Sequence, residues 1–160
     1  MRVLMFGWEF PPYASGGLGT ACYGLTKGLV NQGWDVTFVM PKLPEEAEAD
    51  FVKLISANEN KVKIKGVDTI IQGYMTSEGY TDTISKNGNS MSSIYGSNLY
   101  SEVLRYAENA KTIAKKEYFD IIHAHDWMTY RAGIVAKEVS GKKLVIHVHA
   151  TEFDRTGDNP

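Results

Sequence analysis

The stretch Val3–Met40 reads VLMFGWEFPPYASGGLGTACYGLTKGLVNQGWDVTFVM, and it contains a strand, a helix and a second strand in close succession. Its continuous apolar start, residues 3–6, is typical of a strand buried on both faces and predicts the first, central strand of a sheet. Apolar residues then recur at helical spacing, with Gly33 where helices often end. The predicted buried face of this helix consists of Leu18, Ala21, Cys22, Leu25 and Leu29. Residues 34–40, rich in β-branched and aromatic side chains, predict a second strand joined to the first by one helical crossover, as in a βαβ unit.

The middle of the chain is less regular. Residues 42–59 are charged and poorly patterned, with Pro44-Glu45-Glu46 as a possible helix start. Residues 61–65 and 67–74 are predicted to be strands. Residues 76–93 are dominated by Ser, Thr, Asn and Gly and predict a long loop, which in a compact domain is usually either functional or disordered.

The C-terminal part returns to a regular alternation of helices and strands. A helix is predicted over about residues 97–117, then a strand over residues 118–123 and, after a second helix, a strand over residues 144–148. Asp126 could cap the second helix, and Gly141 supplies its terminator. The apolar faces of the two helices consist of Leu99, Val103, Tyr106, Ala110 and Ile113 in the first and of Met128, Ala132, Val135 and Val139 in the second.

Short apolar strands that alternate with helices predict an α/β fold. We expect a Rossmann-like, doubly wound, mainly parallel sheet with helices on both faces, formed by residues 1–160 as one domain. In such sheets, ligands bind beyond the carboxyl ends of the strands. Candidate functional residues are therefore sought where each predicted strand ends.

Composition limits the classes of partner and compartment. A chain of 160 residues that is 43% hydrophobic can bury a core, and a formal charge of −2 lacks the basic excess that nucleic-acid binding requires. No apolar run approaches the roughly 20 residues of a membrane span, and no export signal follows Met1. The one cysteine, Cys22, cannot form an internal disulfide. We therefore expect a cytoplasmic protein with no nucleic-acid partner and no membrane span.

The first candidate feature is the glycine-rich turn that opens the first helix. Gly16 and Gly17 let the backbone approach a ligand closely, and a helix N-terminus attracts an anion such as phosphate. A nicotinamide-binding fingerprint fits poorly, because Cys22 stands where the third glycine belongs and Met40-Pro41-Lys42 offers no acidic residue for a ribose. A tight turn without a ligand stays open as an alternative.

The second feature is the sequence His123-Ala124-His125-Asp126-Trp127, where a strand gives way to a helix. Alternation places His123 and His125 on the same face if the strand extends that far. Together with His147 and His149, these side chains could in composition form a metal site of four imidazoles. Histidines at strand ends more often hydrogen-bond substrate or backbone, so we expect no metal.

Two further loops have the composition of a binding site. Residues 149–157 form a polar, charged segment directly after a buried strand, and they include Glu152. Residues 8–13 combine three aromatic side chains, two prolines and Glu9, which suits stacking on a sugar or a base. A solvated turn and ordinary packing over the sheet are the alternatives for these two segments.

Together these pieces resemble the N-terminal half of a GT-B glycosyltransferase of the glycogen and starch synthase type. The segments that carry the resemblance are Trp8–Tyr13, Ser15–Gly19, Gly28–Gly33, Ile122–Trp127 and His147–Glu152. One departure is Ala14-Ser15, where glycogen synthases usually carry Lys-Thr. Because of this departure, the chain is compared with related retaining transferases as well as with the glycogen synthases.

The resemblance implies a role for each matching residue. Gly16 and Gly17 would bind the donor diphosphate, and His149 would contact the transferred sugar as a catalytic residue. Asp126 would act as the second catalytic residue, near the sugar or acceptor hydroxyls. Acceptor or sugar binding would fall to Glu9, Trp127 and Glu152. The donor would be a nucleotide-diphosphate sugar such as ADP-glucose or UDP-glucose, with no metal or other cofactor.

The resemblance also implies a two-domain enzyme that moves a hexose to a glycan or other hydroxyl acceptor. A C-terminal nucleotide-sugar-binding domain would hold most donor contacts, and we expect residues 1–160 alone to transfer no sugar. The alternative is a stand-alone carbohydrate-binding or scaffolding domain that kept the fold without catalysis.

Overall fold

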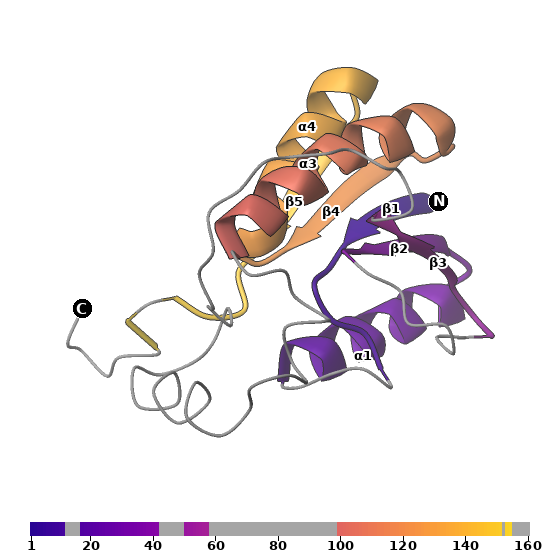
Figure 1. Ribbon diagram of the computed structural model, residues 1–160. Helices are drawn as coiled ribbons and strands as arrows, with labels where there is room; N and C mark the ends of the chain where they lie inside the picture. Colours follow the sequence, from indigo (N-terminus) through magenta and orange to yellow (C-terminus); the bar gives the residue numbers. More distant parts are fainter. Residues whose placement is uncertain (12–16, 42–49, 58–98, 152, 155–160) are drawn as a thin grey trace.

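The protein is built around a five-stranded sheet with strand order β3-β2-β1-β4-β5 (Figure 1). The computed structural model describes residues 1–11, 17–41, 50–57, 99–151 and 153–154. The strands are β1 Arg2–Phe6, β2 Asp35–Met40, β3 Lys53–Ser56, β4 Ile121–His125 and β5 Lys143–His147. All four neighbouring pairs are parallel, and β1 lies in the centre as its apolar run predicts. This arrangement confirms the predicted Rossmann-like α/β fold.

Helices cover both faces of the sheet, which is the doubly wound arrangement that the sequence predicts (Figure 1). Helix α1, Gly17–Asn31, lies on one face, and α3, Leu99–Lys116, and α4, Trp127–Ser140, lie together on the other. The two helices of the second face pack against each other, and α4 also contacts β4 and β5. The carboxyl ends of the strands therefore open between the two helix layers.

The central strand forms the core because helices pack against both of its faces. Val3, Leu4, Met5 and Phe6 are all buried, as expected for a parallel strand with no solvent-facing side. The buried hydroxyl of Tyr106 in α3 donates to the carbonyl oxygens of Gly7 and Val39, at 3.1 and 2.7 Å. This side chain thereby satisfies carbonyls where β1 and β2 end.

Two glycines permit close packing beside the sheet. A Cβ at Gly7 would lie 2.1 Å from Cζ of Phe38. Only glycine therefore fits at the position where the chain leaves β1. A Cβ at Gly133 in α4 would lie 2.8 Å from Cδ1 of Leu144 and 2.9 Å from Cβ of Ala124. Helix α4 therefore packs closely against β4 and β5, and it fixes the two strands that end in histidines.

Several element predictions differ from the structure. Strand β3 lies in residues 42–59, which the sequence analysis did not identify as a strand. The predicted strand over residues 118–123 instead spans Ile121–His125, because its pairing with β1 and β5 places the strand later in the chain. The strands predicted over residues 61–65 and 67–74, the loop over residues 76–93 and the helix start at Pro44 lie outside the described residues.

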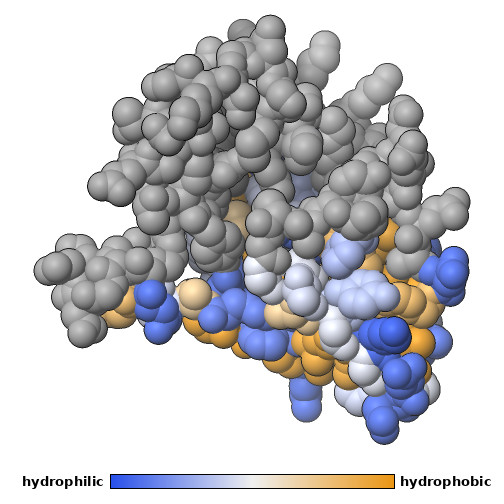
Figure 2. All heavy atoms as spheres, turned by 90° about the horizontal axis from the view of Figure 1, so that it is seen from below, coloured by the Kyte–Doolittle hydropathy of each residue, from blue (hydrophilic) through white to orange (hydrophobic). Residues whose placement is uncertain are grey.

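The predicted helix faces agree with the structure for α3 and in part for α4 and α1. Val103, Tyr106, Ala110 and Ile113 of α3 are buried, and so are Met128 and Ala132 of α4, whereas Val135 and Val139 of α4 are only half-buried. In α1, Leu18 and Cys22 are buried, whereas Ala21 is exposed because that side of the helix faces away from the sheet. Seen from the α1 side, hydrophilic and hydrophobic residues intermingle over the described part of the surface (Figure 2). None of the described helices is long and apolar enough to cross a membrane.

Candidate functional site

The site is built on the carboxyl ends of β4 and β5, where four histidines form a ladder. Strand β4 extends to His125, which pairs in register with His147 of β5. Because side chains alternate along a strand, His123 and His125 lie on one face of β4. His147, the last residue of β5, and His149, two residues beyond it, continue this row of rings. Ring centroids are 4.2 Å apart in His123–His125 and in His147–His149, and 5.1 Å apart in His125–His147. We call these four residues the histidine ladder.

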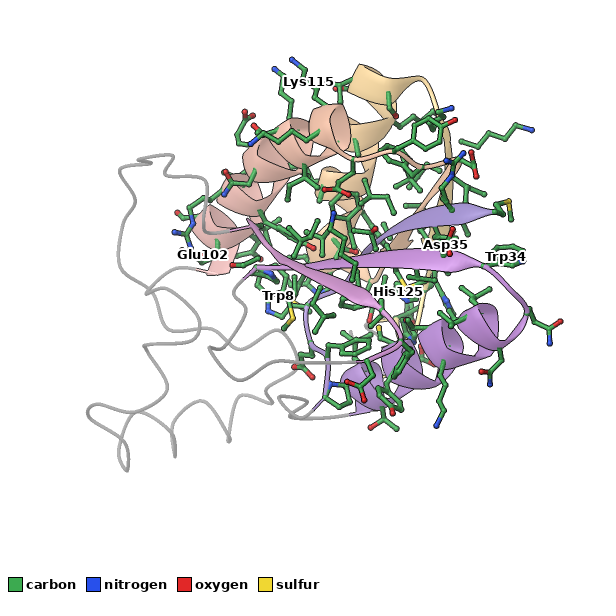
Figure 3. The ribbon with its side chains drawn as sticks, turned by 90° about the vertical axis from the view of Figure 1, so that its right-hand side faces the viewer. Trp8, Trp34, Asp35, Glu102, Lys115 and His125 are labelled. Carbon is green, nitrogen blue, oxygen red and sulfur yellow. The ribbon has the colours of Figure 1, made fainter. Side chains whose placement is uncertain are left out.

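His125 is the most enclosed member of the ladder. It is fully buried, and Figure 3 shows it between the strands and α1, while Lys115 lies at the periphery. Its Nδ1 lies 2.8 Å from Nε2 of His149, a hydrogen bond in which one ring donates and the other accepts. Burial, followed by the neighbouring histidines, lowers the pKa of His125 to about 2 and that of His123 to about 4. Burial also lowers the pKa of His149. These imidazoles are therefore neutral at pH 7.

Asp126 links the end of β4 to the segment that follows β5. Its backbone N–H donates to the carbonyl oxygen of His147 at 2.9 Å, and its Oδ1 accepts from the backbone N–H of His149 at 3.2 Å. The predicted capping role is wrong: within the described residues, the Asp126 side chain makes no capping hydrogen bond to α4. The carboxylate is instead directed to the neighbouring strand, where it positions the backbone of His149.

The backbone of Asp126 is strained. Its φ of 62° and ψ of 169° fall in a region that is populated almost only by glycine and that costs about 1 to 3 kcal/mol. Thr129 supports this conformation, because its buried hydroxyl donates to the carbonyl oxygens of His125 at 2.7 Å and Asp126 at 3.1 Å. Strain of this kind is concentrated at functional sites, where the surrounding structure holds it in place.

The aromatic and acidic residues predicted for sugar binding have different environments. Trp127 is 37% exposed and lies against Tyr100 of α3, with ring centroids 6.0 Å apart. Glu9, in contrast, is buried, with 8% of its surface exposed. Gly17 is the first residue of α1 and is exposed, and the first turn of this helix contains no acidic residue. Gly16 and Glu152 lie outside the described residues.

Cys22 lies next to the histidine ladder. The sequence analysis had placed this residue on the buried face of a helix and had not connected it with the histidines. Its Sγ lies within 4.8 Å of a ring nitrogen of His125 and of His149. Burial raises the pKa of Cys22 to about 12, with further contributions from the carboxylates of Glu9 and Asp126. Cys22 is thus a neutral thiol that lies near His125 of β4 and near His149, which follows β5. Its burial in α1 is visible in the helical pattern, but its proximity to the histidines is not.

Two groups of residues have the spacing to hold a metal ion. In one group, His123, His125 and His147 each offer a ring nitrogen, and these atoms lie within 4.8 Å of one another. In the other, Cys22 joins His125 and His149 within the same limit. The described residues offer no acidic cluster of this kind.

The sequence of the chain matches known proteins over nearly its whole length. Residues 2–159 match the family described as the starch synthase catalytic domain. The chain belongs to this family. The resemblance to glycogen and starch synthases is thereby confirmed.

The curated relatives that the chain matches are longer than the chain itself. An uncharacterized glycosyltransferase, MJ1607, of Methanocaldococcus jannaschii is 28% identical over 159 residues, which are 98% of this chain and 33% of that protein. The glycogen synthase of Mycobacterium tuberculosis is 26% identical over 157 residues, 97% of this chain and 35% of that protein. The chain thus spans about a third of the length of the curated relatives it matches.

Among solved structures, the C-terminal domain of the PF1911 hydrogenase of Pyrococcus furiosus aligns with 91% of this chain and 90% of that chain. The two sequences are 12% identical, and the TM-score is 0.48. At this TM-score, the likeness supports no assignment of fold or function. Membership of the starch synthase family therefore rests on the sequence match.

Proposed function

We propose that this chain is the N-terminal half of a retaining glycosyltransferase that moves a hexose from a nucleotide-diphosphate sugar to a glycan or other hydroxyl acceptor. Family membership supports the transferase class. The observation that carries the proposal is the hydrogen bond between Asp126 and the backbone of His149, at the sheet edge where ligands bind in doubly wound folds. The donor is a nucleotide sugar such as ADP-glucose or UDP-glucose, and the proposed transfer uses no cofactor besides it.

His149 is the proposed contact to the transferred sugar. Nε2 of His125 is buried without a hydrogen-bond partner among the described residues, and a buried N–H is more costly to leave unpaired than a lone pair. The proton of His125 therefore belongs on Nδ1, where it is donated to Nε2 of His149. In this arrangement His149 carries its own proton on Nδ1, which can donate to a sugar oxygen.

Asp126 supplies negative charge and position. The buried carboxylate lies beside His149 through their hydrogen bond, so it stabilises positive charge that develops on the sugar as the bond to the diphosphate breaks. The strained backbone fixes the carboxylate before substrate arrives, and preorganised charge is the form of electrostatic stabilisation that enzymes use most effectively.

The donor diphosphate is proposed to bind at the start of α1. Gly17 exposes backbone amide at the N-terminus of a helix whose first turn carries no acidic residue to repel an anion. Gly16 would provide a second amide from the same turn. Exposed Trp127 is proposed to stack on the acceptor or sugar, with Glu9 and Glu152 binding hydroxyl groups.

A second domain is proposed to complete the donor site. The curated relatives are about three times as long as this chain, which leaves room for a nucleotide-sugar-binding domain of similar size. We therefore propose that residues 1–160 alone transfer no sugar. Glycosyl transfer by the isolated chain at the rate of the full-length protein would contradict this part of the proposal.

The test is to measure glycosyl transfer by the full-length protein with a panel of nucleotide sugars and glycan acceptors. In the His149→Ala variant, kcat should fall by at least about a hundredfold, because the lost contact acts in the transition state. Tyr118→Phe is the matched control, since Tyr118 is 72% exposed and precedes β4, whereas His149 follows the far end of the neighbouring strand. Unchanged kcat in His149→Ala would remove this residue from the site. Glycan binding without transfer by any donor would favour the carbohydrate-binding alternative.

A further inference from the structure

We propose that His123, His125 and His147 form a binding site for a borderline transition-metal ion, with Zn²⁺ as the preferred ion. The site goes beyond the proposed sugar transfer, which does not require a metal. It also departs from the expectation drawn from the sequence, which was that these histidines serve only as hydrogen-bonding groups.

The positions of the three side chains on the sheet support the proposal. His123 and His125 are two residues apart on β4, so their side chains share a face, and His147 of β5 is the register partner of His125. One ring nitrogen from each residue lies within 4.8 Å of the others. Tetrahedral zinc with Zn–N bonds of about 2.0 to 2.1 Å needs nitrogens about 3.3 Å apart, which rotation about the broad χ2 torsion of histidine can provide.

Unsatisfied nitrogen atoms give independent support. Nε2 of His123 and Nε2 of His125 are both buried and have no hydrogen-bond partner among the described residues. A buried polar atom left in this state costs free energy, and a metal ion would satisfy both lone pairs at once. His125 is completely buried, and it lies at the end of β4, between the sheet and α1 (Figure 3).

Neighbouring contacts favour the same protonation state that a metal requires. Ligating histidines usually donate their other ring N–H to an acceptor, which fixes the ring and directs the free lone pair at the ion. His125 has this arrangement, because its Nδ1 is hydrogen-bonded to Nε2 of His149 at 2.8 Å. The bond that positions His149 in the proposed transferase site would therefore also orient His125 toward the ion.

The donor set selects the kind of ion. Imidazole nitrogen suits Zn²⁺, Cu²⁺ and Ni²⁺, whereas Mg²⁺ and Ca²⁺ prefer oxygen ligands. In the competing group, Cys22 and His149 take the places of His123 and His147, but Nε2 of His149 is already engaged in the hydrogen bond with Nδ1 of His125, whereas Nε2 of His123 has no partner among the described residues. We therefore assign the ion to the three-histidine group, with Cys22 outside the first coordination sphere.

The experiment uses the full-length protein after treatment with EDTA and removal of the chelator. Titration calorimetry with Zn²⁺ should show one site, and Tm should rise with added Zn²⁺ but not with Mg²⁺. Added Co²⁺ should give the strong visible absorption of a four-coordinate ion without an intense thiolate-to-cobalt band. No heat, no rise in Tm and no Co²⁺ spectrum would overturn the proposal.

Variants separate the two groups of ligands. His147→Gln should weaken Zn²⁺ binding by more than about a hundredfold, whereas Cys22→Ser should leave the affinity within a factor of about three. His147 is only half-buried, so this variant is expected to fold, and circular dichroism checks that it does. Unchanged affinity in folded His147→Gln, or loss of binding in Cys22→Ser, would overturn the assignment. These measurements need no donor or acceptor, so their failure would leave the proposed transferase function untouched.

Discussion

The carboxylate of Asp126 accepts a hydrogen bond from the backbone N–H of His149, and the two atoms lie 3.2 Å apart. Because the backbone N–H of Asp126 also donates to the carbonyl oxygen of His147, the end of β4 is joined twice to the chain that leaves β5. Two motifs that lie more than twenty residues apart in the sequence are thereby held as one site.

The strain at Asp126 can be measured by comparing two variants. Asp126→Ala and Asp126→Gly both remove the carboxylate, but only glycine adopts a φ of 62° with a ψ of 169° without cost. The glycine variant should therefore have a free energy of unfolding about 1 to 2 kcal/mol higher than the alanine variant, as measured by urea denaturation. Equal stability, or a more stable alanine variant, would show that this backbone is not strained.

Stability should depend on pH through the histidine ladder. Folding lowers the pKa of His123 from 6.5 to about 4 and that of His125 from 6.5 to about 2, so unfolding takes up protons below pH 6.5. The free energy of unfolding should therefore be highest above pH 6.5 and should fall as the pH is lowered toward 4. Protonation of His125 should continue to lower it below pH 4. His125 alone contributes a slope that approaches about 1.4 kcal/mol per pH unit.

This pH dependence is measured by urea denaturation between pH 8 and pH 4 in the presence of EDTA, which removes any bound metal. In His123→Gln, the slope between pH 6.5 and pH 4 should be shallower than in the parent protein. A profile that is flat in the parent, or a slope that is identical in both proteins, would contradict the neutral, half-buried state of His123.

Gly133→Ala should destabilise the fold by about 1 to 3 kcal/mol, because the added methyl group would overlap Leu144 and Ala124. Gly24→Ala is the matched control in α1, where a Cβ meets no atom of the described residues within 4 Å. This control should gain about 0.5 to 1 kcal/mol from helix propensity. Thermal and urea denaturation of both variants would test the close packing of α4 on the sheet, and a neutral Gly133→Ala would contradict it.

Tyr106→Phe should cost about 1 to 2 kcal/mol of stability, because it removes the hydroxyl that donates to the carbonyl oxygens of Gly7 and Val39. Tyr118→Phe serves as its control, since the ring of Tyr118 is largely exposed and should lose its hydroxyl at little cost. The comparison uses the free energy of unfolding from urea titrations. Similar values for the two variants would mean that water replaces the Tyr106 hydroxyl.

Much of the fold could be predicted because its signals are local. The apolar run at residues 3–6 and the helical spacing in residues 97–117 correspond to β1 and α3. Strand β3 was missed because it has four residues, two of which are only half-buried, and it follows a charged segment. Its stability comes from pairing with β2, which no local pattern reveals.

The site was predictable as a set of residues but not as an arrangement. The motif around Asp126 was evident at a strand end. The capping role assigned to its carboxylate was wrong, because Oδ1 of Asp126 accepts a hydrogen bond from the backbone N–H of His149 instead of one from α4. Cys22 was identified as a buried helix residue, and only the packing of α1 beside β4 and β5 brings it near the histidines.

The amino-acid sequence by itself determined the order of the described helices and of the described strands other than β3, and it determined the family, because periodicity and motifs are properties of neighbouring positions. The tertiary structure decided which strands are neighbours and in what register. Pairing of His125 with His147 brings four imidazoles into one ladder, and the positive φ of Asp126 turns its carboxylate toward His149. Both depend on contacts between distant segments, whose free energy is gained only when the sheet has formed.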